Sequence, residues 1–192
     1  FNFLTKILKI PVEKIGITVF GGDKRITQLL EDKESEKIWL DLGIPKERIA
    51  VVKGGVLEKE NNWWGPAGSN GPCGPDTEMF YWKSKEKLPK KFNPDDNNWI
   101  EIWNDVLMEY VKNGGYNEAK QKNIDTGMGV ERTIAVLNGL EDDYLTDCFL
   151  PIINKIEKLS GKKYDVEKSH QTTPFKAWTF RASKKLNKPR LS

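Results

Sequence analysis

The chain has 192 residues, of which 38% are hydrophobic and 31% are charged, and its formal net charge is +3. This composition is typical of a globular protein, and no apolar run approaches the roughly 20 residues that a membrane-spanning helix needs. The small net charge gives no argument by itself for a nucleic-acid partner, and the first ten residues lack the apolar run of a signal peptide. Because the sequence does not begin with methionine, we expect it to start inside a longer protein.

Cysteine and histidine are scarce. Cys73 and Cys148 are the only cysteines, and His170 is the only histidine. Two thiols so far apart do not form a disulfide framework, which favours a reducing, cytoplasmic setting. These three residues cannot supply the four ligands of a structural zinc site, so we expect no zinc in this chain.

The first quarter of the chain predicts alternating helices and strands. Helical periodicity covers Phe1–Leu8, and the β-branched run Ile15–Phe20 predicts a strand that ends at two glycines. Apolar residues at helical spacing predict a helix over Thr27–Leu42, with Gly43 after its end. Ile49–Val52 predicts a second short strand.

The middle of the chain is richer in β-structure. Asn61–Asp76 predicts a Gly/Pro loop, Glu78–Trp82 a strand, and Lys83–Asn98 a polar excursion. Trp99–Tyr110 predicts a long strand that a hairpin turn joins to a returning strand, Tyr116–Asp125.

Two further helices are predicted near the end, over Gly129–Asn138 and Asp147–Leu159. The predicted fold class is therefore α+β, with an antiparallel sheet and helices packed on one side of it. Lys168–Ser192 is basic and lacks periodicity, which favours a solvated, disordered tail over a segment that contacts phosphates.

The segment Asn123–Arg132 carries the strongest functional signal. It reads as a strand that passes through a glycine turn into a helix, with Gly127 and Gly129 leaving room for a ligand to approach the main chain. Arg132 offers a planar fork of donors to phosphate oxygens, and Asp125 can accept from a cationic amine. The alternative is a surface ion pair of Arg132 with Glu131.

Two other segments hold candidate site residues. Trp63 and Trp64 begin the Gly/Pro loop; either both belong to the core, or one of them closes a pocket wall over a small substrate. Glu78 can accept from an adenine amino group or a ribose, or can be a solvated edge residue. Strand alternation places Asn104 on one face with Ile102, Val106 and Met108, where it either bonds to backbone or lines a polar pocket.

Three segments together resemble the catalytic domain of the alanyl-tRNA synthetase family, within the class II aminoacyl-tRNA synthetases. They are the Gly-Pro-Cys-Gly-Pro loop of Asn61–Glu78, the Trp-Asn pair of Glu101–Met108, and Asp-Thr-Gly-Met-Gly-Val-Glu-Arg within Lys122–Leu137, which is similar to class II motif 3. The resemblance implies a class II sheet with flanking helices. It also implies roles for seven residues: alanine binding by Trp64, Asn104, Val106, Asp125 and Gly127, and ATP binding by Glu78 and Arg132.

The reaction implied by the resemblance is activation of alanine with ATP, followed by transfer of the alanyl group to tRNA(Ala). It needs no protein nucleophile, so no catalytic residue is expected, and Mg²⁺ would be bound with the phosphates of ATP. The expected partners are alanine, ATP and tRNA(Ala), with no membrane association. A methyl pocket discriminates poorly against glycine and serine, because one methylene or hydroxyl contributes only about 1–3 kcal/mol.

The sequence also departs from the family pattern. Class II motifs 1 and 2 would precede Phe1, and Asp76 replaces the second cysteine of the loop at a position we expect to lie away from the pocket. We therefore expect residues 1–167 to form a partial catalytic domain that is truncated at both ends and inactive alone, followed by an unmatched basic tail, 168–192.

Two alternatives differ in function from a ligase. A non-catalytic remnant that binds nucleotide or tRNA fits the absent upstream motifs. A stand-alone editing hydrolase would need clustered His and Cys ligands, which one histidine and two distant cysteines do not supply.

Overall fold

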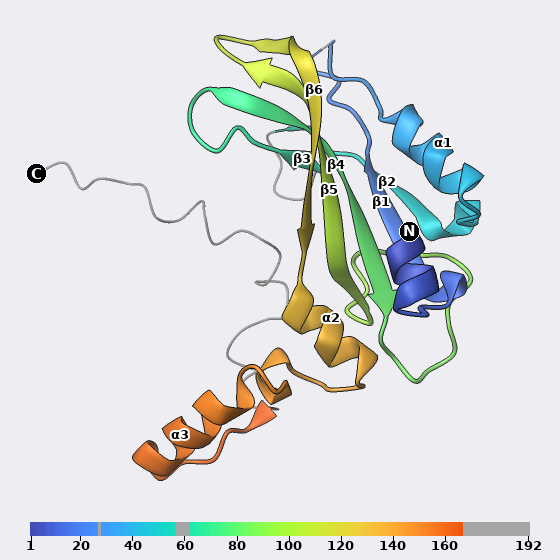
Figure 1. The fold of residues 1–192 in the computed structure, drawn as a ribbon. Coiled ribbons are helices and arrows are strands. Elements are labelled where there is room, and N and C mark those ends of the chain that lie inside the picture. Colours follow the sequence, from blue (N-terminus) through green and yellow to red (C-terminus); the bar gives the residue numbers. More distant parts are fainter. Residues whose placement is uncertain (27, 57–61, 167–192) are drawn as a thin grey trace, which may run out of the picture. The chain divides into compact units, whose positions relative to one another are not determined.

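The computed structural model describes residues 1–26, 28–56 and 62–166, in two compact units, Phe1–Thr133 and Ile134–Ser192. Within the described residues of the first unit, six strands form one sheet in the order β2-β1-β4-β5-β6, and β3 pairs with β4 off this path (Figure 1). The ladders are antiparallel except for the parallel pair of β1 and β2. The predicted α+β class is thus confirmed, while the sheet is mixed rather than wholly antiparallel because β1 and β2 are parallel.

The strands follow the predicted pattern closely except at the Gly/Pro loop. They are β1 (Ile15–Phe20), β2 (Ile49–Val52), β3 (Trp63–Trp64), β4 (Gly71–Trp82), β5 (Trp99–Lys112) and β6 (Tyr116–Met128). The loop prediction was wrong for 63–64 and 71–76, which belong to β3 and β4, while Asn61 lies outside the described residues. β6 continues three residues beyond its predicted end at Asp125.

The helix predicted over Thr27–Leu42 is shorter than expected. α1 spans Lys33–Asp41, and the Asp32 side chain caps it by accepting from the Ser35 N–H. The helix prediction was wrong for residues 28–32. Glu31 forms an isolated antiparallel β-bridge with Gly21, and Asp32 is the N-cap residue that precedes the first turn of α1. Thr27 itself lies outside the described residues. Short helical turns η1 (Phe3–Ile7), η2 (Val12–Lys14) and η3 (Lys46–Arg48) flank β1 and β2 in sequence.

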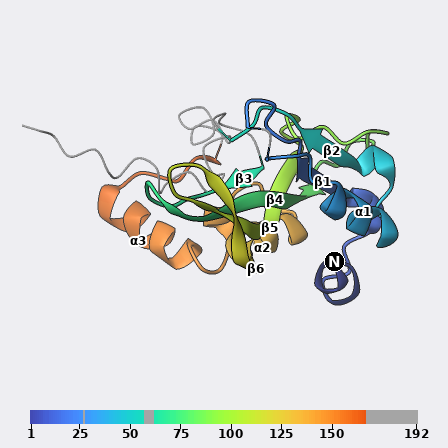
Figure 2. The same ribbon diagram turned by 90° about the horizontal axis from the view of Figure 1, so that it is seen from above.

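Helices cover one face of the sheet. Trp39 of α1 donates from Nε1 to Thr77 Oγ1 of β4 at 2.9 Å, and the ring of Phe3 packs edge-on against Trp103 of β5 at 5.6 Å between centroids. Figures 1 and 2 both show α1 beside β1. Since side chains alternate along a strand, the residues next to Thr77 and Trp103 point to the opposite face.

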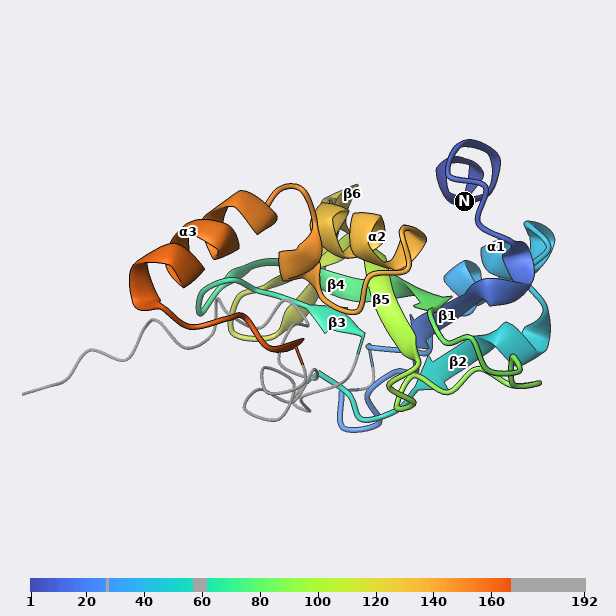
Figure 3. The same ribbon diagram turned by 90° about the horizontal axis from the view of Figure 1, so that it is seen from below.

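That opposite face carries an apolar cluster at each end. One cluster consists of Phe20, Leu29, Trp63 and Cys73, and β3, which supplies Trp63, lies beside β4 in Figure 3. The other consists of Phe80, Trp82, Phe92 and Trp99. Phe92 belongs to the polar excursion after β4 and packs onto Gly16, where an added Cβ would lie 2.5 Å from its ring. Between these clusters the face carries polar residues, among them Thr18, Asp76 and Glu78.

The second unit is helical where it is described. α2 (Val130–Leu137) begins in the first unit and ends in the second, and η4 (Asp143–Leu145) and α3 (Leu150–Ser160) follow. Gly161 ends α3 with a φ of 69°, a left-handed conformation that favours glycine. Both predicted C-terminal helices are confirmed, with α3 beginning three residues later than expected. The tail 168–192 and its boundary at 167 lie outside the described residues.

Among the residues that the structure describes, no helix has the length and apolar character needed to cross a bilayer. Cys73 is buried, Cys148 is exposed, and both are free thiols.

Candidate active site

Five of the seven predicted site residues lie in two neighbouring rows across the sheet. The first row runs from Thr18 of β1 through Glu78 and Asn104 to Gly127 of β6. Residues paired across antiparallel strands share a face, with Cβ atoms about 4.5–5.5 Å apart. The strands therefore bring Glu78, Asn104 and Gly127 together although they are far apart in sequence.

The second row lies two residues along each strand and on the same face. It consists of Asp76 of β4, Val106 of β5 and Asp125 of β6. Val106 is buried, whereas Asp125 is exposed on the edge strand and its Oδ1 accepts from the Thr126 N–H at 3.0 Å. The predicted alanine residues Asn104, Val106, Asp125 and Gly127 thus form one contiguous patch.

Gly127 lies unusually close to the side chain opposite it. A Cβ built on Gly127 would lie 2.8 Å from Asn104 Oδ1, which is closer than ordinary contact. The amide of Asn104 therefore occupies the space that a side chain at 127 would fill. Glycine at this position allows the Asn104 amide to lie against the main chain of β6, and the approach of a ligand there stays a prediction.

Arg132 is held at the other side of the first row. The Gly129 N–H donates to the Ile102 carbonyl at 3.0 Å and fastens the start of α2 to β5. Arg132 Nη1 donates to the Glu101 carbonyl at 2.7 Å and lies 4.0 Å from Glu101 Oε2. Asp125 and Arg132 are thus separated by the Asn104–Gly127 pair rather than adjacent, so a ligand that reaches both must extend across the first row.

The two tryptophans have different environments. Trp63 is buried, with ring centroids 5.2 Å from Phe20, 5.6 Å from Tyr110 and 5.5 Å from Tyr116. Trp64 pairs with Gly74 at the edge of β4 and is half-buried. Trp63 is therefore the core residue of the pair, and the role of Trp64 as a pocket wall stays a prediction.

Sequence reasoning placed Asp76 away from the site, and that placement was wrong. Asp76 is buried in the second row, directly opposite Val106 and two residues from Glu78 on the same face. Its Oδ1 is buried without a hydrogen-bond partner. Residues 71–76 were expected in a loop, where strand alternation gives no side-chain direction, so the sequence offered no signal for this contact.

Glu101 was also missed. The β4–β5 register shifts between Met79 and Phe80, so that Phe80 pairs with Glu101 and Ile102 is skipped. The shift turns Glu101 to the face of Glu78, whereas simple alternation from Asn104 places it on the other face. Its side chain is 12% exposed beside Arg132, and only knowledge of the pairing could have revealed it.

Three carboxyl groups on this face, those of Asp76, Glu78 and Glu101, have raised pKa values. Burial raises the pKa of Asp76 to about 7, against the lowering effect of the Asn62 hydrogen bond and with a contribution from Glu101. Burial, followed by the charges of Asp76 and Glu101, also raises the pKa of Glu78 well above its usual range. Burial raises the pKa of Glu101, and the nearby Arg132 opposes this. Clusters of perturbed carboxyl groups are typical of functional sites.

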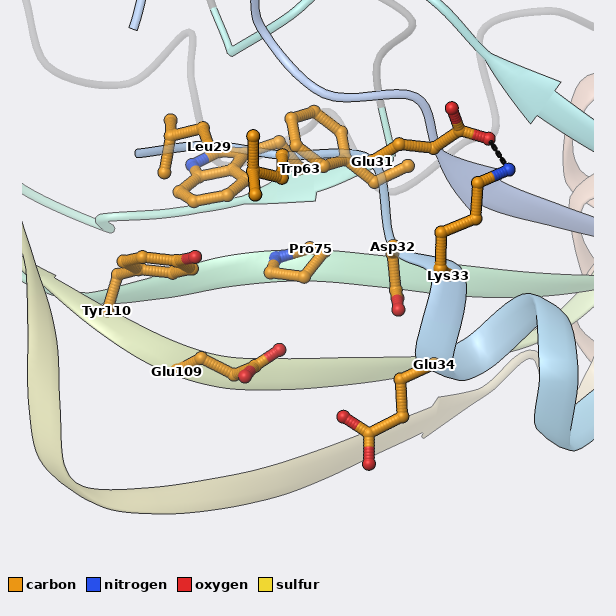
Figure 4. Close-up of a pocket in the computed structure, with 11 residues that line it drawn as sticks. Leu29, Glu31, Asp32, Lys33, Glu34, Trp63, Pro75, Glu109 and Tyr110 are labelled. Atoms are coloured by element: carbon orange, nitrogen blue, oxygen red, sulfur yellow. Dashed lines mark hydrogen bonds and ion pairs between the residues drawn. The ribbon is translucent and has the colours of Figure 1, made fainter. Parts of the chain in front are cut away.

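A separate pocket of about 220 Å³ opens beside the apolar cluster that contains Trp63 (Figure 4). Trp63, Pro75 and Tyr110 line it together with acidic residues, of which Glu31 is paired with Lys33. None of the seven predicted site residues lines this pocket. In the described part of the chain, no group of three acidic, His or Cys side chains is arranged to hold a metal ion.

The chain is similar to known tRNA ligases. The family profile of the tRNA synthetases class II (A) matches residues 1–177. Alanine–tRNA ligase of Treponema denticola is 48% identical over 176 residues, which are 88% of this chain and 28% of that protein. Alanine–tRNA ligase of Borrelia hermsii is 47% identical over 170 residues, 85% of this chain and 27% of that protein.

A more distant relative, alanine–tRNA ligase of Mycoplasmopsis pulmonis, is 38% identical over 180 residues, which are 90% of this chain and 19% of that protein. The chain spans less than a third of the length of each of these relatives. The family profile covers most of the chain, including every residue of the two rows and Arg132. The chain therefore belongs to the class II (A) family of tRNA synthetases.

Proposed function

We propose that this chain forms part of the catalytic core of an alanine–tRNA ligase, which activates alanine with ATP and transfers it to tRNA(Ala) in the cytoplasm. The observation that carries the proposal is the pair of cross-strand rows, which gathers Glu78, Asn104, Gly127, Val106 and Asp125 on one sheet face. The relatives named above, all alanine–tRNA ligases, support the choice of amino acid.

In this proposal the second row binds the amino acid. The Asp125 carboxylate accepts from the α-ammonium group of alanine, and Val106 and Trp64 enclose the methyl group. The Asn104 amide and the Gly127 main chain border the same site, at the contact where an added Cβ would be 2.8 Å from Asn104 Oδ1. The buried Val106 side chain and the exposed Asp125 carboxylate suit a small ligand with one apolar and one cationic end.

The remaining residues bind the nucleotide. Glu78 meets the base or ribose of ATP from the first row, and Arg132 meets the phosphates. One Arg132 donor is already bonded to the Glu101 carbonyl at 2.7 Å. This backbone contact fixes the side chain, and a planar guanidinium is suited to bind phosphate oxygens in pairs.

The reaction proceeds by positioning and charge stabilisation. An oxygen of the alanine carboxylate attacks the α-phosphorus of ATP, a new P–O bond forms, and pyrophosphate leaves with the electrons of the broken P–O bond. A terminal ribose hydroxyl of tRNA then attacks the alanyl carbonyl, and AMP leaves. Mg²⁺ would be bound together with the phosphates of ATP, where it would neutralise their charge.

The test is alanine-dependent ATP–pyrophosphate exchange by the full natural protein that carries this chain. Exchange that requires alanine, and that Arg132→Ala abolishes, is the expected result. Salt-sensitive tRNA binding without any alanine-dependent exchange would contradict the proposal and favour a non-catalytic RNA-binding role.

A further inference from the structure

The carboxyl group of Glu78 is held by a neighbouring strand. Thr18 of β1 stands opposite Glu78 in the first row, and its Oγ1 donates to Glu78 Oε2 at 2.9 Å. Thr18 is 1% exposed, so no water competes for this hydroxyl. One oxygen of the Glu78 carboxyl is therefore fixed from within the sheet.

A second residue determines the direction of that hydrogen bond. Asn62 Nδ2 donates to Thr18 Oγ1 at 2.7 Å. An amide nitrogen can only donate, so the Thr18 oxygen accepts from Asn62 and its single proton is left for Glu78. The result is a directed chain of hydrogen bonds from the Asn62 amide through the Thr18 hydroxyl to the Glu78 carboxyl.

Asn62 is itself anchored to β4. Its carbonyl accepts from the Asp76 N–H at 2.8 Å, and its Nδ2 also lies 3.3 Å from the Asp76 carbonyl. Asn62 is 6% exposed and has a φ of 46°, a left-handed conformation that asparagine adopts more readily than most residues. The residue type, its backbone conformation and these hydrogen bonds place one amide beside Thr18.

We propose that Thr18 and Asn62 are positioning residues for ATP, which orient the Glu78 carboxyl toward the base or ribose of the nucleotide. The inference rests on the proposed function, in which Glu78 contacts ATP. It extends the site to two buried residues on other elements, which act through the Glu78 carboxyl.

The test measures KM for ATP and for alanine in pyrophosphate exchange by the full natural protein. Thr18→Val removes the hydroxyl and keeps the shape, and should raise KM for ATP about fivefold, the size expected for one hydrogen bond. KM for alanine should change less than twofold. Thr18→Ser restores the hydroxyl and should return KM for ATP to within about twofold of the wild-type value.

Asn62→Gly is a second, independent variant. Glycine accepts the φ of 46° while the amide is lost, so KM for ATP should again rise and KM for alanine should not. If Thr18→Val does not fold, the comparison of Asn62→Gly with the wild type decides the question. Equal rises in both KM values, accompanied by a lower melting temperature, would show a merely structural role and overturn the inference.

Glu78→Gln separates this inference from the proposed function. If Glu78→Gln leaves KM for ATP unchanged, the proposed contact of Glu78 with ATP is wrong. If Glu78→Gln raises KM for ATP but Thr18→Val and Asn62→Gly do not, the proposed function survives and the positioning role is wrong. If Glu78→Gln and Thr18→Val each raise KM for ATP, Thr18→Val should add little in the background of Glu78→Gln, because the two changes disturb one interaction.

Discussion

Asn104 and Gly127 are paired across β5 and β6, and a Cβ on Gly127 would lie 2.8 Å from Asn104 Oδ1. The colliding atom is the far end of a side chain rather than backbone, so the asparagine can rotate away. The contact therefore matters more for the position of the amide than for the stability of the sheet.

Gly127→Ala should leave the protein folded but displace the Asn104 amide. We expect the free energy of unfolding to change by less than about 1 kcal/mol, because alanine also restricts the unfolded chain. KM for alanine should rise at least tenfold while KM for ATP changes little. The double variant Asn104→Ala/Gly127→Ala should be no worse than Asn104→Ala alone, and a further loss in the double variant would contradict this account.

Asp125→Asn tests the proposed ammonium contact. Loss of the negative charge should raise KM for alanine by more than tenfold and KM for ATP by less than twofold, measured by pyrophosphate exchange. Asp105→Asn is the matched control: Asp105 pairs with Thr126 on the opposite face of the same two strands, so both KM values should stay near those of the wild type. Equal effects of Asp125→Asn on both substrates would remove Asp125 from its assigned role.

Strand positions were predicted well because they depend on local patterns. The bounds of β1 and β2 match the β-branched runs Ile15–Phe20 and Ile49–Val52, and alternation along β5 correctly placed Asn104 and Val106 on one face. The start of α1 was missed although Asp32, its cap, belongs to a residue type that favours this position. Hydrophobic spacing alone extended the helix too far toward its N-terminus.

The missed site residues depend on pairing between strands. Asp76 and Glu101 reach the site through the register of β4 against β5, including a shift that skips Ile102. Thr18 lies 60 residues before Glu78 in the sequence and reaches the site only because β1 pairs with β4. Periodicity within one segment contains no information on how two strands pair. The residues of Asn123–Arg132 could therefore indicate only part of the site.

Asp76→Asn should change how stability depends on pH. An acid whose pKa is raised on folding, here from 3.8 to about 7, binds a proton more tightly in the folded state. Its contribution to stability is fully present below pH 4, declines as pH rises from about 4 to 7, and is absent above that range. Asparagine removes this decline, so the variant should match the wild type near pH 4 and exceed its unfolding free energy at pH 8 by roughly 2–4 kcal/mol.

Urea unfolding at pH 4, 6 and 8 measures this effect. Asp95→Asn, at an exposed position of the loop between β4 and β5, is the control and should follow the wild-type pH dependence. Parallel pH profiles for Asp76→Asn and the wild type would show that the Asp76 carboxyl does not titrate in this window.

Gly74→Ala should destabilise the sheet strongly. A Cβ on Gly74 would lie 1.7 Å from the Leu107 carbonyl oxygen of β5, and backbone cannot rotate away as the Asn104 side chain can. Relief would require separation of β4 from β5, next to the register shift that places Asp76 opposite Val106. We expect a loss of about 3 kcal/mol or more in the free energy of unfolding.

Gly115→Ala is the control. Gly115 lies in the β5–β6 turn, where no atom lies within 4 Å of an added Cβ, so this variant should change the free energy of unfolding by less than about 0.5 kcal/mol. Similar unfolding midpoints for the two variants would mean that β4 and β5 do not approach as closely at Gly74 as the structure shows.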